Sequence, residues 1–397
     1  MSSEMLLGEI AEIVMGQSPS GETCNNAGNG IPLLNGPTEF GPKHPVPVQY
    51  TTDAKRLGKE GDLLFCVRGS TTGKMNWANQ TYAIGRGLAA IRGKNNYPNS
   101  YIRAAIELEL NSLLNQATGS TFPNVSKDQL NAISLTKTSP EAATDIALII
   151  EPIDDRITLL RETNATLEAI AQALFKSWFV DFDPVRAKAE GREPEGMPAE
   201  IADLFPSEFE ESELGDIPKG WEIRKADLLL TRLNAKIKFT KEQVFSSGKT
   251  PVFEQGAGLL LGFHDDEAQL QASPDEPMFI FGDHTCITHL SCEPFDISAN
   301  VIPLKGKDRS SLWTYYAIKN KQTFQEYRRH WSELAVKEVV VAPNNLCKVF
   351  SEFALPLYLK MEINSKEVNS LSHIRDTLLP RLMSGKLRIP DLEEQAA

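Results

Sequence analysis

The chain repeats its own pattern after about 205 to 215 residues, and this duplication limits the folds that it can adopt. The segment GDLLFCVRGST (Gly61–Thr71) is echoed by PMFIFGDHT (Pro277–Thr285), and YAIGRGLAAI (Tyr82–Ile91) by FDISANVIPL (Phe295–Leu304). A period this long indicates a duplicated domain, because solenoid units recur every ~20 to 50 residues. Two similar strand-rich domains favour a recognition protein over a single-site enzyme.

Each strand-rich copy leads into a long segment with helical periodicity. Ser139-Pro140-Glu141 is typical of a helix start, with a Ser cap, Pro in the first turn and an acid near the positive end of the helix dipole. Apolar and small side chains then recur at alternating intervals of mostly four and three residues, as in a coiled coil. The expected packing residues are Ile157, Leu160, Asn164, Leu167, Leu174, Trp178, Asn364, Val368, Leu371 and Leu378. We expect the two seams to pack on each other, with the two asparagines fixing the register.

These patterns predict an α+β fold, in which two duplicated strand-rich domains are separated by a pair of long antiparallel, coiled-coil-like helices. With 397 residues and 41% hydrophobic residues, the chain is long enough for two or three domains. The expected order is a first domain (1–138), a central helix (139–180), an acidic Pro/Glu-rich connector (181–216), a second domain (217–345), a distal helix (346–390) and an acidic tail (391–397).

The net charge of −12 is unevenly distributed along the chain. Residues 190–216 contain ten acidic residues and one basic residue, and the tail after Pro390 contains three more acids. The rest of the chain is therefore close to neutral, so that Lys and Arg remain available for a nucleic-acid-binding face. Apolar runs are too short to span a bilayer, and five irregularly spaced cysteines indicate reduced thiols. We expect a cytoplasmic protein without a membrane segment or an export signal.

Motifs for catalysis and for cofactor binding are incomplete in this sequence. GSTTGKM (Gly69–Met75) has three residues between its glycines where a phosphate-binding loop needs four. His284, Cys286, His289 and Cys292 are ligand-type residues, but their spacing is better explained by a β-hairpin with one packed face than by a zinc site. A methyl-donor loop with its catalytic box is also missing. We therefore predict no catalytic residue, metal ion or cofactor on this chain.

Polar loop residues suit base edges and phosphates instead. Arg pairs with guanine and Asn or Gln with adenine, while Lys, Ser and Thr hold phosphates. The candidate DNA contacts in the first domain are Arg68, Ser70, Thr71, Thr72, Lys74, Asn76, Asn79 and Arg86. In the second domain they are His284, Thr285, Lys236, Lys238, Arg328, Arg329 and His330, with Thr288 and His289 in equivalent positions.

Three segments resemble the specificity subunits of type I restriction-modification enzymes. Ala173–Ile223 closely resembles the central conserved region of that family, Leu378–Ile389 its distal conserved region, and Leu7–Gly21 the entry to its first target-recognition domain. The resemblance implies two target-recognition domains, each reading one half of a bipartite, asymmetric site in double-stranded DNA. It also implies two methyltransferase subunits that bring S-adenosylmethionine and methylate adenine, and motor-nuclease subunits that bring ATP and Mg²⁺.

An alternative interpretation remains open from the sequence. The duplicated domains could bind proteins, in which case the chain would be a scaffold or antirestriction partner that binds methyltransferase subunits without reading DNA. Sequence-specific methylation by the assembled complex would distinguish the two.

Overall fold

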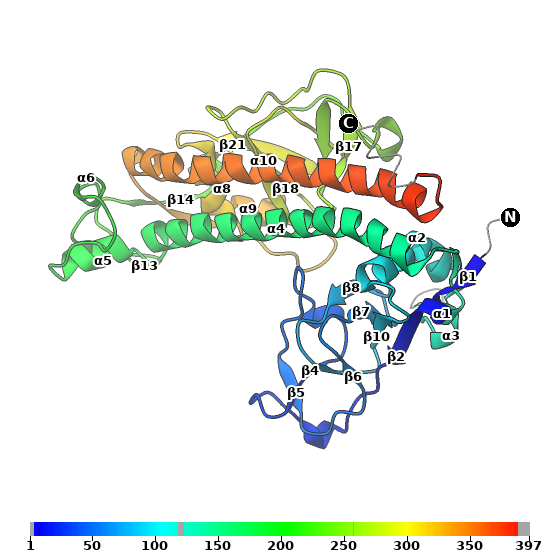
Figure 1. The fold of residues 1–397 in the computed structure, drawn as a ribbon. Coiled ribbons are helices and arrows are strands. Elements are labelled where there is room, and N and C mark those ends of the chain that lie inside the picture. The colour runs from blue at the N-terminus through cyan, green and yellow to red at the C-terminus, as the bar shows by residue number, and fades with distance from the viewer. Residues whose placement is uncertain (1–3, 118–122, 257, 388–397) are drawn as a thin grey trace. The chain divides into compact units, whose positions relative to one another are not determined.

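A computed structural model describes residues 4–117, 123–256 and 258–387, and the predicted acidic tail (391–397) lies outside these residues. The chain divides into two compact units: unit 1 comprises residues 1–163 and 364–397, and unit 2 comprises residues 164–363. Two long helices, α4 (Pro140–Phe179) and α10 (Asn344–Met383), each contribute to both units (Figure 1). The predicted helix boundaries, 139–180 and 346–390, lie close to these two elements.

Unit 1 is a mixed domain of short strands and helices, together with the part of α4 up to Thr163 and the part of α10 from Asn364. Its other elements are β1 (Glu4–Leu6), α1 (Leu7–Ile10), β2 (Ala11–Met15), η1 (Gly21–Thr23), β3 (Cys24–Asn25), β4 (Ile31–Leu34), η2 (Pro37–Glu39), β5 (Gln49–Thr51), β6 (Leu57–Gly58), β7 (Leu63–Cys66), β8 (Met75–Trp77), β9 (Tyr82–Ile84), β10 (Leu88–Gly93), α2 (Asn99–Gln116), α3 (Lys127–Asn131) and β11 (Ser134–Thr136).

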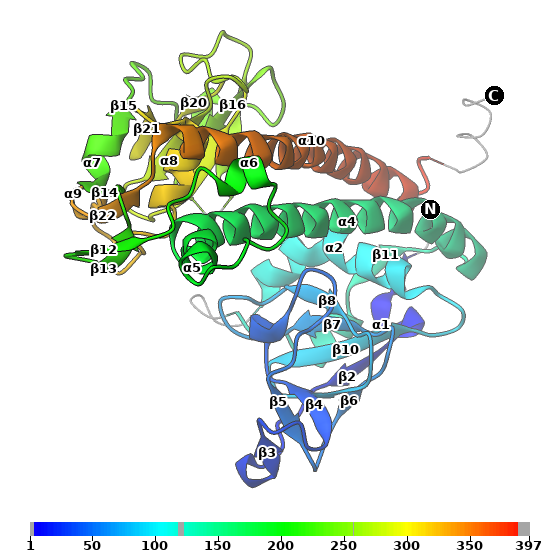
Figure 2. The same cartoon turned by 90° about the vertical axis from the view of Figure 1, so that its left-hand side faces the viewer.

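Two sheets form the body of unit 1. One has the order β2-β10-β7-β8 and is antiparallel, and the other has the order β3-β5-β4-β9-β6, with β4 and β9 parallel. The strands β7, β9 and most of β10 are buried on both faces, which explains their continuous apolar sequences. The β4–β5 region lies at the end of the unit remote from the first half of α4 (Figure 2).

A single core connects the four-stranded sheet of unit 1 to the long helices. It contains Leu63 and Ile91 from the sheet, Ile102 from α2, Ile146 from α4 and Leu382 from α10, all less than a tenth exposed. Burial of each such side chain contributes roughly 1.5 to 3 kcal/mol before the cost of ordering the chain. The strand-rich domain is therefore packed firmly on its own portion of the helix pair.

Unit 2 repeats this architecture with a longer lead-in. Its elements besides the long helices are α5 (Asp183–Ala189), α6 (Ala199–Ala202), β12 (Phe209–Ser212), β13 (Gly215–Pro218), β14 (Glu222–Lys225), α7 (Ala226–Leu229), β15 (Leu230–Arg232), η3 (Lys241–Gln243), β16 (Thr250–Phe253), β17 (Leu260–His264), β18 (Met278–Gly282), β19 (Thr288–Ser291), β20 (Asp296–Ile297), β21 (Val301–Gly306), α8 (Ser311–Ile318), α9 (Trp331–Ala335) and β22 (Glu338–Val341).

The sheet order confirms the duplication that the sequence predicts. The β15-β21-β18-β19 sheet of unit 2 has the same connectivity as the β2-β10-β7-β8 sheet of unit 1, and the parallel β16–β20 pair corresponds to the β4–β9 pair. The β14–β22 ladder likewise corresponds to β1–β11. The predicted hairpin around the His/Cys cluster is β18–β19, whose strands pair from Met278–Ser291 to Phe281–Thr288.

Residues 181–216, expected as a connector, contribute to the fold of unit 2. They contain α5, α6 and the strand β12, which pairs with β13. Phe205 is 2% exposed and packs edge-on against Trp178 of α4, with 5.4 Å between their ring centroids. Aromatic packing of this kind adds to the free energy of burial, so this acidic segment is held on the end of α4.

Within each unit the two long helices run antiparallel. In unit 1, Ile157 and Leu160 of α4 form a small buried cluster with Val368, and Leu371 packs against it. In unit 2, Asn164 donates from Nδ2 to the carbonyl of Met361 over 3.0 Å. Among the other predicted seam residues, Trp178 belongs to the core of unit 2 and Leu174 packs against that core. Leu378 packs against the core of unit 1. Leu167 is half-buried and Asn364 is fully buried. Searched over its described residues, the chain has no helix long and apolar enough to cross a membrane.

Candidate nucleic-acid interface

The β7–β8 turn of unit 1 carries most of the predicted DNA contacts. Arg68, Ser70 and Lys74 are exposed on this turn. Thr72 Oγ1 lies 2.8 Å from the carbonyl oxygens of both Gly69 and Pro123, so this hydroxyl donates within the fold. Thr71 is half-buried, and its Oγ1 lies 3.6 Å from Cys66 Sγ. The turn thus uses its threonines to hold its shape and presents the cations and the serine to solvent.

The prediction that Asn76 contacts DNA is wrong. This residue is 6% exposed and donates from Nδ2 to the carbonyl of Gly41 over 2.8 Å, because β8 turns its side chain into the domain. Asn79 is exposed, as expected for a contact residue, and its Oδ1 accepts a 2.6 Å hydrogen bond from the Tyr82 hydroxyl. The amide nitrogen of Asn79 and the second lone pair of its Oδ1 remain available to a ligand.

Arg86 lies next to the β7–β8 turn, at a close crossing of four backbone segments. The amide of Val67 donates to the carbonyl of Gly87 over 2.9 Å, which places Arg68 and the exposed Arg86 on neighbouring segments. A Cβ added at Gly87 would lie 2.3 Å from the carbonyl oxygen of Asn35, and one at Gly16 would lie 2.1 Å from that of Gly85. Glycine is needed at these positions because no side chain fits between the crossing backbones.

An amide-rich hollow lies beside this crossing and was missed in the sequence. It has a volume of about 520 Å³ and is lined by Ser18, Asn25, Asn26, Asn35 and Gln49, among others. Asn35 donates from Nδ2 to Oε1 of Gln49 over 3.1 Å, and Ser18 Oγ accepts from the amide of Arg86 over 3.2 Å. Asn35 opens the Gly/Pro-rich segment NGPTEFGP (Asn35–Pro42), a pattern that is typical of turns and carries no binding signal of its own.

The corresponding β18–β19 turn of unit 2 is more enclosed. His284 and Thr285 are half-buried, and the backbone amide of His284 donates to Oε1 of Gln255 over 2.9 Å. The His284 ring packs edge-on against Tyr327, with 4.7 Å between centroids, while Tyr327 itself is 75% exposed. Thr288 and His289 lie on β19 and are half-buried. Burial and the nearby charge of Lys319 lower the pKa of His289 to about 4, which keeps its ring neutral at pH 7.

His330 cannot contact phosphate, contrary to the prediction. Its side chain is 0% exposed, its Nδ1 lies 3.1 Å from Glu333 Oε2 and its Nε2 lies 3.0 Å from the carbonyl of Glu326. The neighbouring Arg328 pairs with Glu326 over 2.8 Å and with Glu333. Arg329 is 77% exposed at its side chain and 3.7 Å from Asp283, so it is more accessible than Arg328, whose side chain is 44% exposed.

Two predicted lysines lie on the segment between β15 and η3 of unit 2. Lys236 is exposed. Lys238 donates from Nζ to the carbonyl of Val301 over 3.1 Å. Partial burial of the ammonium, together with the charge of Arg232, lowers the pKa of Lys238. Lys236 is therefore the better placed of the two for a phosphate contact.

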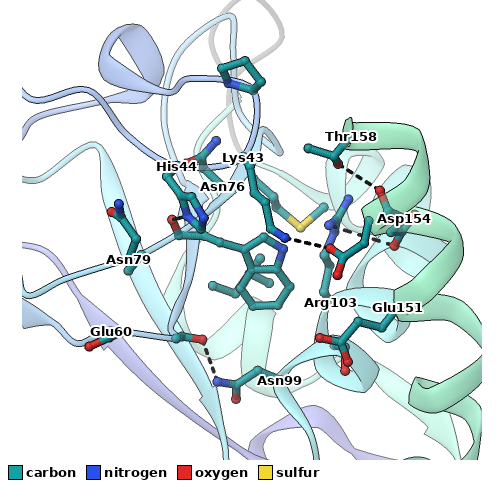
Figure 3. A pocket seen from close by; sticks show the side chains of 18 of the residues that line it. Lys43, His44, Glu60, Asn76, Asn79, Asn99, Arg103, Glu151, Asp154 and Thr158 are labelled. Carbon is teal, nitrogen blue, oxygen red and sulfur yellow. Dashed lines mark hydrogen bonds and ion pairs between the residues drawn. The ribbon is translucent and has the colours of Figure 1, made fainter. Parts of the chain in front are cut away.

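The pocket shown in Figure 3 lies between the strand-rich part of unit 1 and α4, and it is lined by more charged side chains than the amide-rich hollow. Its volume is about 620 Å³, and its α4 wall carries Glu151, Asp154 and Asp155. Lys43 pairs with Asp155 over 2.8 Å, and Arg103 Nη1 lies 4.0 Å from Asp154. Arg161 of α4 also lines the pocket, so its acidic and basic side chains largely offset each other. The ion pairs join the domain to the helix within unit 1.

Metal chemistry is not suggested by the arrangement of ligand-type residues. Over residues 4–117, 123–256 and 258–387, no three His, Cys, Asp or Glu side chains gather where they could hold a metal ion. The β7–β8 turn leads from strand to strand, whereas a phosphate-binding loop leads from a strand into a helix. The described surface presents polar and cationic side chains on the turns of two similar domains.

Comparisons with known proteins agree with this geometry. Residues 2–169 match the family described as type I restriction modification DNA specificity domain. The chain is 24% identical over 409 residues to the type I restriction enzyme HindI specificity subunit of Haemophilus influenzae, covering 84% of this chain and 88% of that one. It is 24% identical over 427 residues to the MjaIX specificity subunit of Methanocaldococcus jannaschii, covering 97% and 93%. The crystal structure of the type I restriction-modification S subunit from M. genitalium shares the fold, with a TM-score of 0.58, 15% identity and 96% coverage of both chains.

Proposed function

Because the chain belongs to the specificity subunits of type I restriction-modification enzymes, we propose that it reads a bipartite, asymmetric DNA site and directs adenine methylation and restriction by partner subunits. The chain is the non-catalytic, DNA-binding component of the complex. Unit 1 reads one half-site and unit 2 reads the other.

One observation carries this proposal: the same sheet connectivity occurs twice, with different side chains on corresponding turns. The β7–β8 turn presents Arg68, Ser70 and Lys74, whereas the β18–β19 turn carries His284 and Thr285. A repeated scaffold suits two half-sites, and unlike contact residues suit two unlike sequences. Because hydrogen bonds to base edges discriminate sequence, the difference between the turns makes the whole site asymmetric.

Each unit needs only modest affinity for its half-site. When two binding modules are linked, the second binding event becomes intramolecular, and its effective concentration raises the overall affinity. The gain is lost when the half-sites do not match the distance that the linker sets. A fixed number of unspecified base pairs between the half-sites follows from this argument.

The chemistry is supplied by other chains. The specificity subunit assembles with methyltransferase and restriction subunits, and we propose two methyltransferase subunits for each specificity chain, one for each repeat. These subunits bring S-adenosylmethionine, and the restriction subunits bring ATP and Mg²⁺. The specificity subunit holds DNA so that a methyltransferase can flip the target adenine, at a cost of a few kcal/mol in lost stacking.

Co-expression with the methyltransferase subunit in a methylation-free host tests the proposal. Modified adenines are mapped across the host genome by single-molecule sequencing, and a host that expresses the methyltransferase subunit alone serves as the control. The expected result is one split motif with a constant gap, which depends on the specificity chain. Co-purification of the two subunits without any motif would favour the scaffold alternative.

A further inference from the structure

Within the proposed function, on which this inference rests, we infer that Asn35 and Gln49 form an adenine-reading pair in unit 1. The pair selects an adenine of the first half-site other than the one that is methylated. It lies in the amide-rich hollow beside the β7–β8 turn, among residues that the sequence patterns did not single out.

The two side chains are fixed against each other by one hydrogen bond. Asn35 Nδ2 donates to Gln49 Oε1 over 3.1 Å, and neither residue forms a second side-chain hydrogen bond within the described chain. The pair therefore has a free acceptor, Asn35 Oδ1, and a free donor, Gln49 Nε2. If both amides were rotated by 180°, one donor and one acceptor would still remain. Adenine presents the matching set in the major groove, with N6–H as donor and N7 as acceptor.

The surroundings of the pair hold it in place. The carbonyl of Asn35 lies against Gly87 at the backbone crossing, and the amide of Gly85 donates to the carbonyl of Leu34 over 2.8 Å. Asn35 is exposed and Gln49 is half-buried, so a base edge can reach both amides. The exposed Arg86 lies on the adjoining segment and can hold a phosphate of the same strand.

Unit 2 differs at the corresponding position. Leu34 pairs with Ile84 in the parallel β4–β9 ladder, and Phe253 pairs with Ile297 in the parallel β16–β20 ladder. The residue after Phe253 is Glu254, where unit 1 has Asn35. A carboxylate only accepts hydrogen bonds and cannot offer the donor that adenine N7 needs. The adenine requirement is thus specific to the half-site that unit 1 reads.

The first experiment maps the methylated motif for complexes that contain N35A, Q49A or both substitutions. Q49E is included because it keeps the shape of the side chain and removes its donor. The control is N115A, since Asn115 is an exposed amide on α2 of the same unit. We expect one adenine of the first half-site to become degenerate, with discrimination falling roughly 5- to 150-fold. The second half-site and the gap should stay the same, and N115A should leave the whole motif unchanged.

The second experiment measures binding to duplexes in which 7-deazaadenine replaces each half-site adenine in turn. At the adenine that the pair contacts, loss of N7 should weaken DNA binding by the unsubstituted complex roughly 5- to 150-fold. The same base change should not weaken DNA binding by the Q49A complex any further. This binding measurement tests adenine reading by the pair even if the N35A/Q49A complex assembles poorly. Equal penalties in both complexes, or an unchanged motif in N35A/Q49A, would overturn the inference. If the unsubstituted complex gave no split motif at all, the proposed function itself would fail.

Discussion

Arg375 of α10 donates from Nη1 to Oδ1 of Asp154 on α4 over 3.0 Å, so an ion pair joins the two long helices within unit 1. Both side chains are largely buried, with exposures of 23% and 16%. Burial alone would disfavour the charged guanidinium, but the hydrogen bonds to Asp154 and Asp376 outweigh it and raise the pKa of Arg375. The pair also approaches Arg103 of α2, and thereby links the domain to both helices.

Removing this cation should destabilise unit 1. We expect R375A to lower the free energy of unfolding by about 2 kcal/mol, because Asp154 is left partly buried without its main partner. Denaturation followed by circular dichroism measures the change. R381A is the matched control, since Arg381 lies on the same helix and is exposed. Equal effects of the two substitutions would show that the ion pair contributes nothing specific.

The apolar seam between the helices offers a sharper comparison. Leu160 is 4% exposed within the cluster around Ile157 and Val368, whereas the adjacent Leu159 is 54% exposed. L160A should cost about 2 to 4 kcal/mol, since it leaves a cavity as well as losing buried area. L159A should change stability by less than about 0.5 kcal/mol. The two variants can be compared by thermal and chemical denaturation, and a similar loss in both would contradict the observed packing of α4.

Unit 2 should lose stability in acid through His289. The pKa of this histidine in the folded chain is about 4, below the ordinary value of 6.5, so the unfolded chain takes up the proton more readily. Its stabilising contribution is complete above pH 6.5 and is lost as the pH falls through about 4. H289Q should remove roughly 1 to 3 kcal/mol of the stability difference between pH 7 and pH 4. H373Q, at an exposed histidine of α10, should keep the full pH dependence.

Lengthening both helices should change the gap between half-sites. Four residues inserted after Thr163 and four after Ile363, at the two boundaries between the units, add ~6 Å to each helix. We expect the gap in the methylated motif to change by roughly one to two base pairs while both half-sites stay the same. The same insertion in the exposed segment 191–196 should leave the motif unaltered. An unchanged gap in the helix variant would show that helix length does not set the spacing.

Arg86 should contribute to DNA affinity through phosphate contacts. R86A should weaken binding of the complex and reduce the slope of log K against log salt concentration by about 1, since one fewer counterion is released. Binding is measured by titration of labelled duplex at several salt concentrations. K127A is the control, because Lys127 is exposed on α3. A salt slope unchanged in R86A would exclude a phosphate contact at this residue.

Sequence patterns predicted the repeated architecture because they depend on local periodicity. The cap at Ser139 and the alternating apolar intervals correspond to the start and the packing face of α4. The short hydrophobic runs likewise correspond to β7 and β18, which occupy equivalent positions in their sheets. Helix caps and hydrophobic periodicity can be recognised in the sequence without knowledge of tertiary contacts.

Polar residues were harder to assign, because their environment depends on partners far away in the chain. The Asn76 side chain bonds to Gly41, 35 residues earlier, and the Thr72 hydroxyl to the carbonyl of Pro123, 51 residues later. The Asn35–Gln49 pair escaped notice for the same reason, since only the pairing of β4 with β5 brings these two residues together. Exposure of a polar side chain therefore could not be deduced from residue type alone.

The backbone crossing at Gly16 and Gly87 also bears on how such a chain could diversify. Neither glycine has a positive φ, and both are required because another backbone passes within the space of a methyl group. The crossing therefore tolerates no change, whereas the adjoining exposed side chains of Asn35 and Arg86 can be exchanged with little effect on packing. A lineage could thus acquire new target sequences by point substitution at the rim while inheriting the frame intact.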